Sequence, residues 1–181
     1  MNIGEELVSS YLRYILGCEF VQKNLSTVES QGEIDVVGIN LKEKTVYICE
    51  VATHLITGLL YTKGTSPNNV QKLTEKLSRD IVYAKAYFPE YTHHFMLWSP
   101  IVKSGKDGAK HSQIRDIEEI KLNVSNQHQI EVECIMNEDF SRRIEEMHKF
   151  AREKTEELKC PVMRFLQIEE HLNKHVEKIN S

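Results

Sequence analysis

The chain has 181 residues, of which 40% are hydrophobic and 28% are charged, and it contains few glycines and prolines. This length suits one domain with a sizeable core, and this composition excludes a disordered chain and a collagen-like fibre. The net charge of −4 is not typical of a nucleic-acid-binding protein, although residues 67–121 carry a net positive charge of their own.

The lack of a targeting signal in the sequence and the spacing of its cysteines both favour a cytoplasmic protein. No apolar run is long enough to cross a bilayer, and the first residues lack the basic and apolar regions of a signal peptide. The four cysteines (Cys18, Cys49, Cys134 and Cys160) are widely spaced and form no CxxC pair. We therefore expect buried, reduced thiols rather than disulfides or a zinc site, and no membrane partner.

The apolar pattern of the first 52 residues predicts one helix and three strands. Apolar residues recur at helical spacing over residues 3–16. Three segments rich in β-branched and aromatic residues follow, namely 18–25, 33–39 and 45–52. Only a short polar loop separates the last two segments, so residues 31–52 are expected to form an antiparallel hairpin.

The rest of the chain predicts helices alternating with strands, then two final helices. A glycine-containing loop over 57–66 precedes a helix over 67–88, with Ser66 as N-cap and Pro67 at its first position. Val70, Leu73, Leu77 and Ile81 should pack that helix on the sheet. The remaining elements are a strand over 92–98, a loop over 101–109, a helix over 111–124, a strand over 128–136, and helices over 140–158 and 162–176. This order predicts a single α/β domain, a mixed central β-sheet flanked by helices.

Two acidic residues stand inside otherwise apolar strands. Asp35 lies in the segment Gly-Glu-Ile-Asp-Val-Val, and Glu50 lies in Tyr-Ile-Cys-Glu-Val-Ala. A carboxylate among such residues is costly to bury unless something pairs with it. A divalent hard cation held by Asp35, Glu50 and the Val51 carbonyl explains both acids. The alternative is a pair of exposed acids on an edge strand.

These segments resemble the core motif of the PD-(D/E)XK nuclease superfamily, in its restriction-endonuclease-like and Holliday-junction-resolvase-like branches. The resemblance covers residues 4 to about 98 and matches the family's two acids to Asp35 and Glu50. It implies a restriction-endonuclease-like sandwich in which residues 1–98 form the nuclease core, 99–136 complete the sheet and helices, and 137–181 form an α-helical C-terminal extension.

The chain departs from the family pattern where the third strand should end in E-x-K. Alanine occupies the lysine position, at Ala52. Some branches of the superfamily place this lysine on the following helix, where Lys72 and Lys76 lie one turn apart. We prefer Lys72, which is nearer the helix N-terminus, over Lys76. The alternative for both lysines is a solvated basic helix face.

Three further residues are candidates for the same site. His54 follows the third strand and could position a water or a phosphate, although a lone histidine is more often structural. The resemblance also places a glutamate on the first helix. The spacing after Gly4 favours Glu5, whereas counting back from Gly17 favours Glu6, and either glutamate could instead interact with the helix dipole.

The resemblance implies a Mg²⁺-dependent endonuclease, with Mn²⁺ as a substitute, that hydrolyses phosphodiester bonds of DNA in restriction, phage defence or repair. A second copy of the chain, or a partner subunit of a restriction or defence system, is a further expected partner. The rival expectation, favoured by Ala52, is an inactive nuclease-fold module that binds nucleic acid or acts as a scaffold. A purely structural or protein-interaction domain built around the C-terminal helices is a second rival, and it predicts no metal binding.

Overall fold

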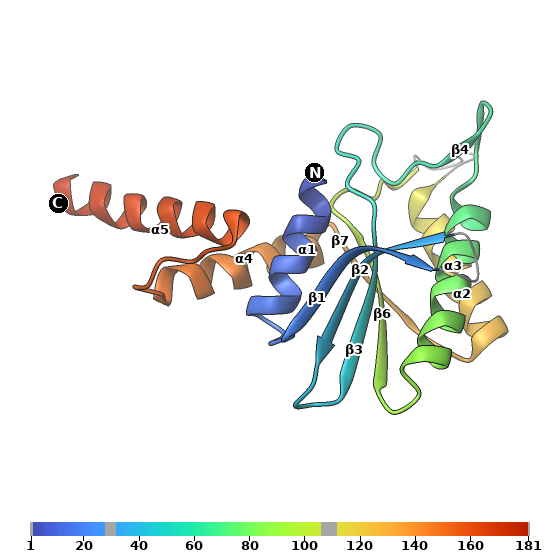
Figure 1. Ribbon diagram of the computed structural model, residues 1–181. Coiled ribbons are helices and arrows are strands. Elements are labelled where there is room, and N and C mark those ends of the chain that lie inside the picture. Colours follow the sequence, from blue (N-terminus) through green and yellow to red (C-terminus); the bar gives the residue numbers. More distant parts are fainter. Residues whose placement is uncertain (1, 28–31, 106–111, 181) are drawn as a thin grey trace.

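The computed structural model describes residues 2–27, 32–105 and 112–180. They form an α/β structure in which helices lie on both faces of a mixed five-stranded sheet, and a further helix extends to one side (Figure 1). No helix within these three ranges combines the length and apolarity that a bilayer span requires.

The five strands are arranged in the order β1-β2-β3-β6-β7. Their bounds are Phe20–Thr27 (β1), Gly32–Asn40 (β2), Thr45–Val51 (β3), Thr92–Ser99 (β6) and Val132–Met136 (β7). β2 is antiparallel to both β1 and β3, whereas β6 runs parallel to β3 and β7 parallel to β6. The predicted hairpin is confirmed, because β2 and β3 pair from Val36–Cys49 to Asn40–Thr45.

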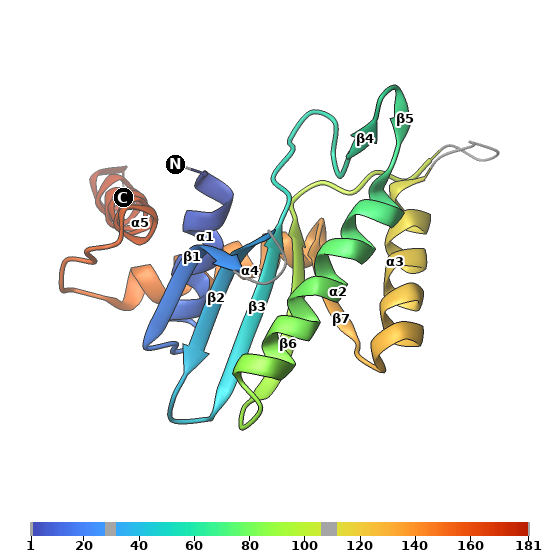
Figure 2. The ribbon, with the colours of Figure 1, turned by 45° about the vertical axis from the view of Figure 1, so that its right-hand side comes forward.

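Helices cover the sheet in two layers (Figure 2). α2 (Asn69–Tyr87) and α3 (Gln113–His128) lie on one face, and α1 (Ile3–Tyr14) and α4 (Glu138–Glu153) lie on the other. α2 and α3 each connect two parallel strands. Because such crossovers are almost always right-handed, two of them that proceed in one direction along the sheet place both helices on the same face. α5 (Pro161–Asn180) packs on α4 rather than on the sheet.

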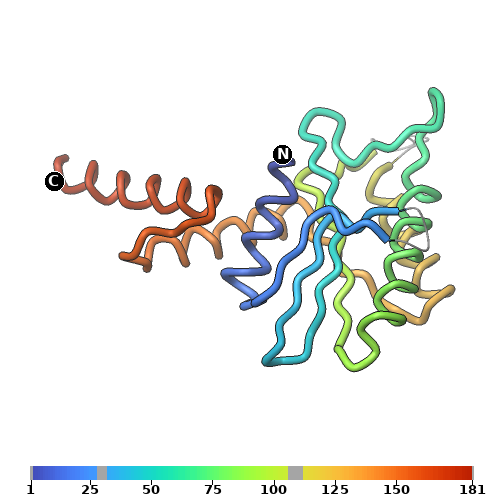
Figure 3. Tube along the Cα trace, viewed as in Figure 1, coloured from blue at the N-terminus to red at the C-terminus, as the bar shows by residue number. Residues whose placement is uncertain are grey.

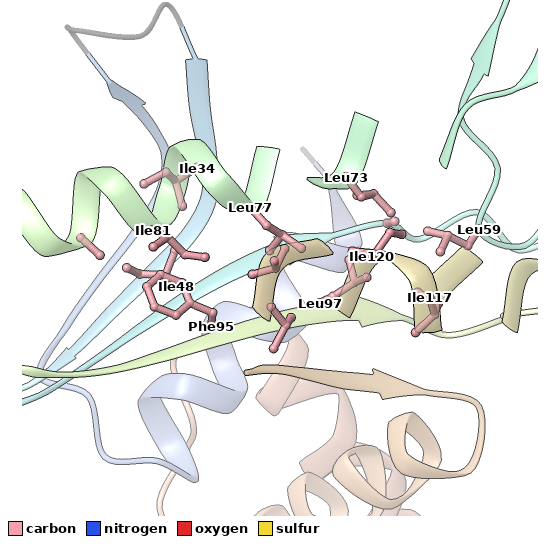
Figure 4. Close-up of a cluster of buried hydrophobic side chains, with 14 of the residues drawn as sticks. Ile34, Ile48, Leu59, Leu73, Leu77, Ile81, Phe95, Leu97, Ile117 and Ile120 are labelled. Carbon is pink, nitrogen blue, oxygen red and sulfur yellow. The ribbon is translucent and has the colours of Figure 1, made fainter. Parts of the chain in front are cut away.

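An apolar cluster fills each space between sheet and helices. On the α2 side, Leu73, Leu77 and Ile81 pack against strand residues that include Ile48 and Phe95 (Figure 4). This arrangement confirms the predicted sheet-facing side of α2, and Val70 borders the same cluster. On the α1 side, the chain's single tryptophan, Trp98, is completely buried, and its ring meets that of Tyr11 edge-on at 5.2 Å.

The predicted start of α2 was wrong. Ser66–Pro67 forms a short strand (β5) that pairs with Thr62–Lys63 (β4), so the predicted loop over 57–66 contains a small hairpin. Gly64, at φ +63°, makes the tight turn between the two strands, and the residue before a proline favours extended backbone. The helix consequently begins two residues later, at Asn69, with Asn68 as its N-cap.

Several helices and strands in the second half of the chain also begin or end at other residues than predicted. α3 continues to His128, four residues beyond its predicted end. Its C-cap residue, Gln129, adopts the left-handed conformation (φ 59°) in which glycine is usual. β7 consequently begins only at Val132. α4 ends at Glu153, earlier than predicted, and α5 begins at Pro161, because proline suits the first helical position. Residues 106–111, where the sequence predicts the end of a loop and the start of α3, lie outside the described residues.

Candidate functional site

Asp35 lies where β2 and β3 separate. The ladder between these strands extends only as far as the Val36–Cys49 pair, so the next residues of the two strands do not pair. The Asp35 side chain connects the two strands there instead of the backbone, because its Oδ2 accepts a hydrogen bond from the backbone N–H of Val51 at 2.8 Å. The side chain of Asp35 is thereby fixed close to the end of β3 on which Glu50 stands.

Glu50 is almost completely buried, with 1% of its side chain exposed. It follows Ile48 on the face of β3 that α2 covers. Lys76 of α2 forms an ion pair and a hydrogen bond with Glu50 Oε2, and its ammonium also lies 3.6 Å from Asp35 Oδ1. One cation therefore lies between the two strand carboxylates.

A second ion pair lies one helical turn further along α2. The Arg79 guanidinium donates to the carboxylate of Asp80 at 2.8 Å and to the backbone carbonyl of Glu33 at 2.7 Å. It also lies 3.6 Å from Glu50 Oε1. Asp80 is completely buried. Among the described residues, neither Glu50 Oε1 nor Asp80 Oδ2 has a hydrogen-bond partner, so two buried carboxylate oxygens remain without a donor.

Burial and neighbouring charges shift the pKa values of three groups at the site. Burial raises the pKa of Glu50 well above its usual value, and repulsion by Asp35 raises it further, against the opposing effect of Lys76. Burial likewise raises the pKa of Asp80, although Arg79 partly opposes the shift. Burial alone would lower the pKa of Lys76, but Glu50 and Asp35 outweigh it and raise that pKa. Burial therefore makes the ionised forms of Glu50 and Asp80 costly, while Lys76 stays charged.

Tyr61 borders this charge cluster from the segment between β3 and α2. Burial raises its pKa, and Lys76, Glu50 and Asp35 all contribute to the field at its hydroxyl. The buried side chain of Asn69 accepts from the Tyr61 N–H at 2.6 Å and donates to the Leu59 carbonyl at 2.9 Å. The first turn of α2 thus fixes Tyr61 next to the carboxylates.

The other predicted site residues lie in varied surroundings. Ala52 is buried within the apolar cluster on the α2 side. Lys72 is exposed on α2 and forms none of the described ion pairs. His54 is exposed, and its ring lies edge-on to Tyr61 at 6.0 Å. Lys76 is therefore the predicted lysine that contacts both acids.

The two glutamates of α1 have different partners. Glu6 pairs with Lys23 of β1, whereas Glu5 is largely buried and accepts a hydrogen bond from Asn2 at 2.6 Å. A Cβ on the adjacent Gly4 would lie 2.3 Å from the Thr53 side chain, so glycine permits α1 to approach the segment that follows β3. Glu5 is consequently on the turn of α1 that contacts the end of the Glu50 strand.

The structure adds Asp80, Arg79 and Tyr61 to the residues predicted from the sequence. Asp80 had a signal in the sequence, because it lies seven residues after Leu73 and one before Ile81, on the apolar face of α2. Its neighbour Arg79 is the cation that such a buried acid requires. Tyr61 had no comparable signal, since its position depends on the hairpin of β4 and β5 that precedes α2.

The oxygen-rich donor set suits a hard divalent cation more than a soft metal. The carboxylates of Asp35 and Glu50 both lie next to the ammonium of Lys76, and a buried oxygen of Glu50 lacks a hydrogen-bond donor. Within the described ranges, no three histidine, cysteine or acidic side chains are grouped as a ready metal cluster. Lys76 lies between the two acids, and a bound metal would have to share them with its ammonium.

No protein-family model matches the chain, and no curated protein or solved structure matches it significantly.

Proposed function

We propose that the chain is a Mg²⁺-dependent nuclease of the PD-(D/E)XK type that hydrolyses DNA. Asp35 and Glu50 bind the metal, with the Val51 carbonyl as a further oxygen ligand, and Lys76 replaces the lysine that the third strand lacks. One observation carries the proposal: the ammonium of Lys76 comes from α2 and contacts both strand acids, while Ala52 fills the expected lysine position.

The charges around the site support this proposal. Three acids (Asp35, Glu50 and Asp80) face two cations (Lys76 and Arg79) within one ion-pair cluster. One negative charge is left over, and for Glu50 the repulsion by Asp35 adds to the effect of burial, which is the larger cause of its raised pKa. A divalent cation would offset this charge and lower the pKa of Glu50.

Each residue then has a distinct task. Asp35 is oriented by the Val51 N–H and Glu50 by its burial, so both carboxylates are fixed before substrate arrives. Lys76 keeps its proton and donates toward negative charge that develops on the scissile phosphate. Arg79 and Asp80 hold α2 and the start of β2 together, which positions Lys76. Bound Mg²⁺ supplies a Lewis acid for the phosphate and lowers the pKa of a coordinated water.

An inactive nuclease-fold module is the second candidate. The observation that favours it is that Lys76 and Arg79 already pair with the strand and helix acids, so the cluster is largely satisfied without a metal. In this case the site is a buried ion-pair network that holds α2 on the sheet.

Cleavage of supercoiled plasmid DNA separates the two candidates. The wild-type chain should nick the plasmid with Mg²⁺ or Mn²⁺ and stop when EDTA is added. Asp35→Asn, Glu50→Gln and Lys76→Met should each reduce the rate at least ~100-fold, as expected when an electrostatic contact to the transition state is removed. Lys72→Met is the matched control, because it removes an exposed lysine one turn away on the same helix, and it should cleave at nearly the wild-type rate.

The remaining outcomes are equally informative. No cleavage by a folded wild-type chain on duplex, branched or single-stranded DNA would favour the inactive module. Cleavage that survives Glu50→Gln and EDTA would place the chemistry elsewhere on the protein. Loss of activity in Lys72→Met but not in Lys76→Met would reverse the assignment of the lysine.

A further inference from the structure

The C-terminal helix α5 has a buried face and, opposite it, an exposed apolar face. The first is used within the chain, where Met163, Leu166, Gln167 and Glu170 are buried against α4 and its neighbours. The second consists of Phe165, Ile168, Leu172, Val176 and Ile179, whose side chains are between 44% and 68% exposed. We call this second set the α5 stripe.

Helix geometry places the two faces on opposite sides. At about 100° per residue, the five members of the α5 stripe fall within roughly 40° of Leu172, and the buried residues centre on the far side of the helix. Glu169 and His175 lie just outside the stripe, so its centre contains no charged side chain. A contiguous row of exposed apolar side chains of this kind marks an interaction site.

The second half of α5 has little else to stabilise it. α5 extends away from the sheet (Figures 1 and 3), and every residue from His171 to Asn180 is exposed. A helical segment of this length is marginal in water without packing of an amphipathic face. We therefore expect another apolar surface to pack on the α5 stripe and stabilise this half of the helix.

We propose that a second copy of this chain covers the α5 stripe, with the two α5 helices packed antiparallel about a twofold axis at Leu172. The stripe is symmetric about Leu172, because its other members lie seven and four residues before Leu172 and four and seven residues after it. An antiparallel copy therefore sets Phe165 against Ile179, Ile168 against Val176 and Leu172 against Leu172. Such a self-complementary patch is what a twofold interface requires.

The shape of the molecule favours the antiparallel orientation over the parallel one. The sheet and its helices lie beyond the N-terminal end of α5 (Figure 1). A parallel pair would bring both sheets together at one end, whereas an antiparallel pair separates them to opposite ends. The α4–α5 pairs of the two chains would then meet as four helices, an arrangement that buries one apolar row from each chain.

Sedimentation equilibrium of the full chain tests the dimer. The wild-type protein should show twice its chain mass of 21.0 kDa and dissociate only on dilution. Leu172→Glu places two like charges at the axis and should give a folded monomer. Leu122→Glu is the matched control, because Leu122 on α3 is a leucine of similar exposure (59% against 56%) outside the stripe, and it should remain dimeric.

Cysteine cross-linking tests the orientation. A mixture of Phe165→Cys and Ile179→Cys chains should oxidise to a disulfide-linked heterodimer, while each variant alone should resemble the wild-type chain with its native cysteines. Efficient cross-linking of Phe165→Cys with itself would refute the antiparallel arrangement.

The proposal as a whole is overturned by two results. One is a wild-type chain that stays monomeric at all concentrations, including a monomer that instead binds phosphatidylserine-containing vesicles and so assigns the stripe to a membrane surface. The other is a dimer that survives Leu172→Glu. Neither result depends on nuclease activity, so the dimer and the proposed chemistry fail separately.

Discussion

Replacing Lys76 by methionine should lower the free energy of unfolding by about 3–5 kcal/mol at neutral pH, the range found when one partner of a buried ion pair is removed. Methionine keeps most of the side-chain volume and removes the charge. The side chains of Lys76, Glu50 and Asp35 are 18%, 1% and 16% exposed, so solvent screens these contacts poorly.

The structure points to the lower end of that range. Arg79 remains 3.6 Å from Glu50 Oε1 and offsets part of the lost attraction. Glu50 can also take up a proton, because burial and Asp35 already raise its pKa. Loss of Lys76 removes the main group that lowers this pKa, so the neutral form becomes the native form over a wider pH range.

The pH dependence has a definite sign. A carboxyl whose pKa is higher in the folded than in the unfolded chain binds its proton more tightly when folded, so stability falls as pH rises from about 4.3 toward the folded pKa. In Lys76→Met this fall extends further, and the deficit relative to wild type should be larger at pH 7 than at pH 5. The contribution of Lys76 in the wild type is complete at both pH values, because its own pKa is raised.

A double-mutant cycle measures the pair itself. Urea unfolding followed by the fluorescence of the buried Trp98 would be recorded for wild type, Lys76→Met, Glu50→Gln and the double variant. Lys76→Met should cost less in the Glu50→Gln background, with a coupling of about 2 kcal/mol or more for groups in direct contact. A coupling near zero, or a Lys76→Met variant as stable as wild type at both pH values, would refute the reasoning.

Three further predictions concern stability. Glu50→Gln should raise the melting temperature at pH 7 but not at pH 4, where the acid is already neutral, and it should abolish any rise caused by Mg²⁺. Gln167→Ala should cost about 2–3 kcal/mol in urea unfolding, because this buried amide bonds to backbone groups of Lys154, Glu156 and Leu158 between α4 and α5. Gly4→Ala should cost about 1–3 kcal/mol by the same assay, and Thr53→Ala should recover part of that loss by removing the clashing atoms.

The sequence predicted the central part of the fold because apolar periodicity governs it. β2, β3 and β6 are dense in β-branched and aromatic residues, and α2 carries an apolar row, so both the hairpin and the packing of α2 could be expected. The ends of helices and strands were harder to predict. Gln129 caps α3 in a left-handed conformation that glycine normally adopts, and glutamine at this position does not predict a helix end.

The choice between Lys72 and Lys76 shows a similar limit at the site. Both lysines lie on one helix face, and which of them meets the acids depends on how α2 is placed along the sheet. That placement depends on the small hairpin of β4 and β5, which uses Pro67 as a strand residue and delays the helix. Asp35 and Glu50 were easier to single out, because an acid inside an apolar strand stands out in the sequence without any knowledge of neighbouring elements.

The division of the charge cluster between sheet and helix has a consequence for dynamics. Asp35 and Glu50 belong to β2 and β3, whereas Lys76, Arg79 and Asp80 all come from α2. A transient opening in which α2 alone leaves the sheet would separate the acids from their cations without unfolding the strands. The population of this partly opened form, which amide hydrogen exchange along α2 reports, sets the fraction of molecules in which the site is assembled at any moment.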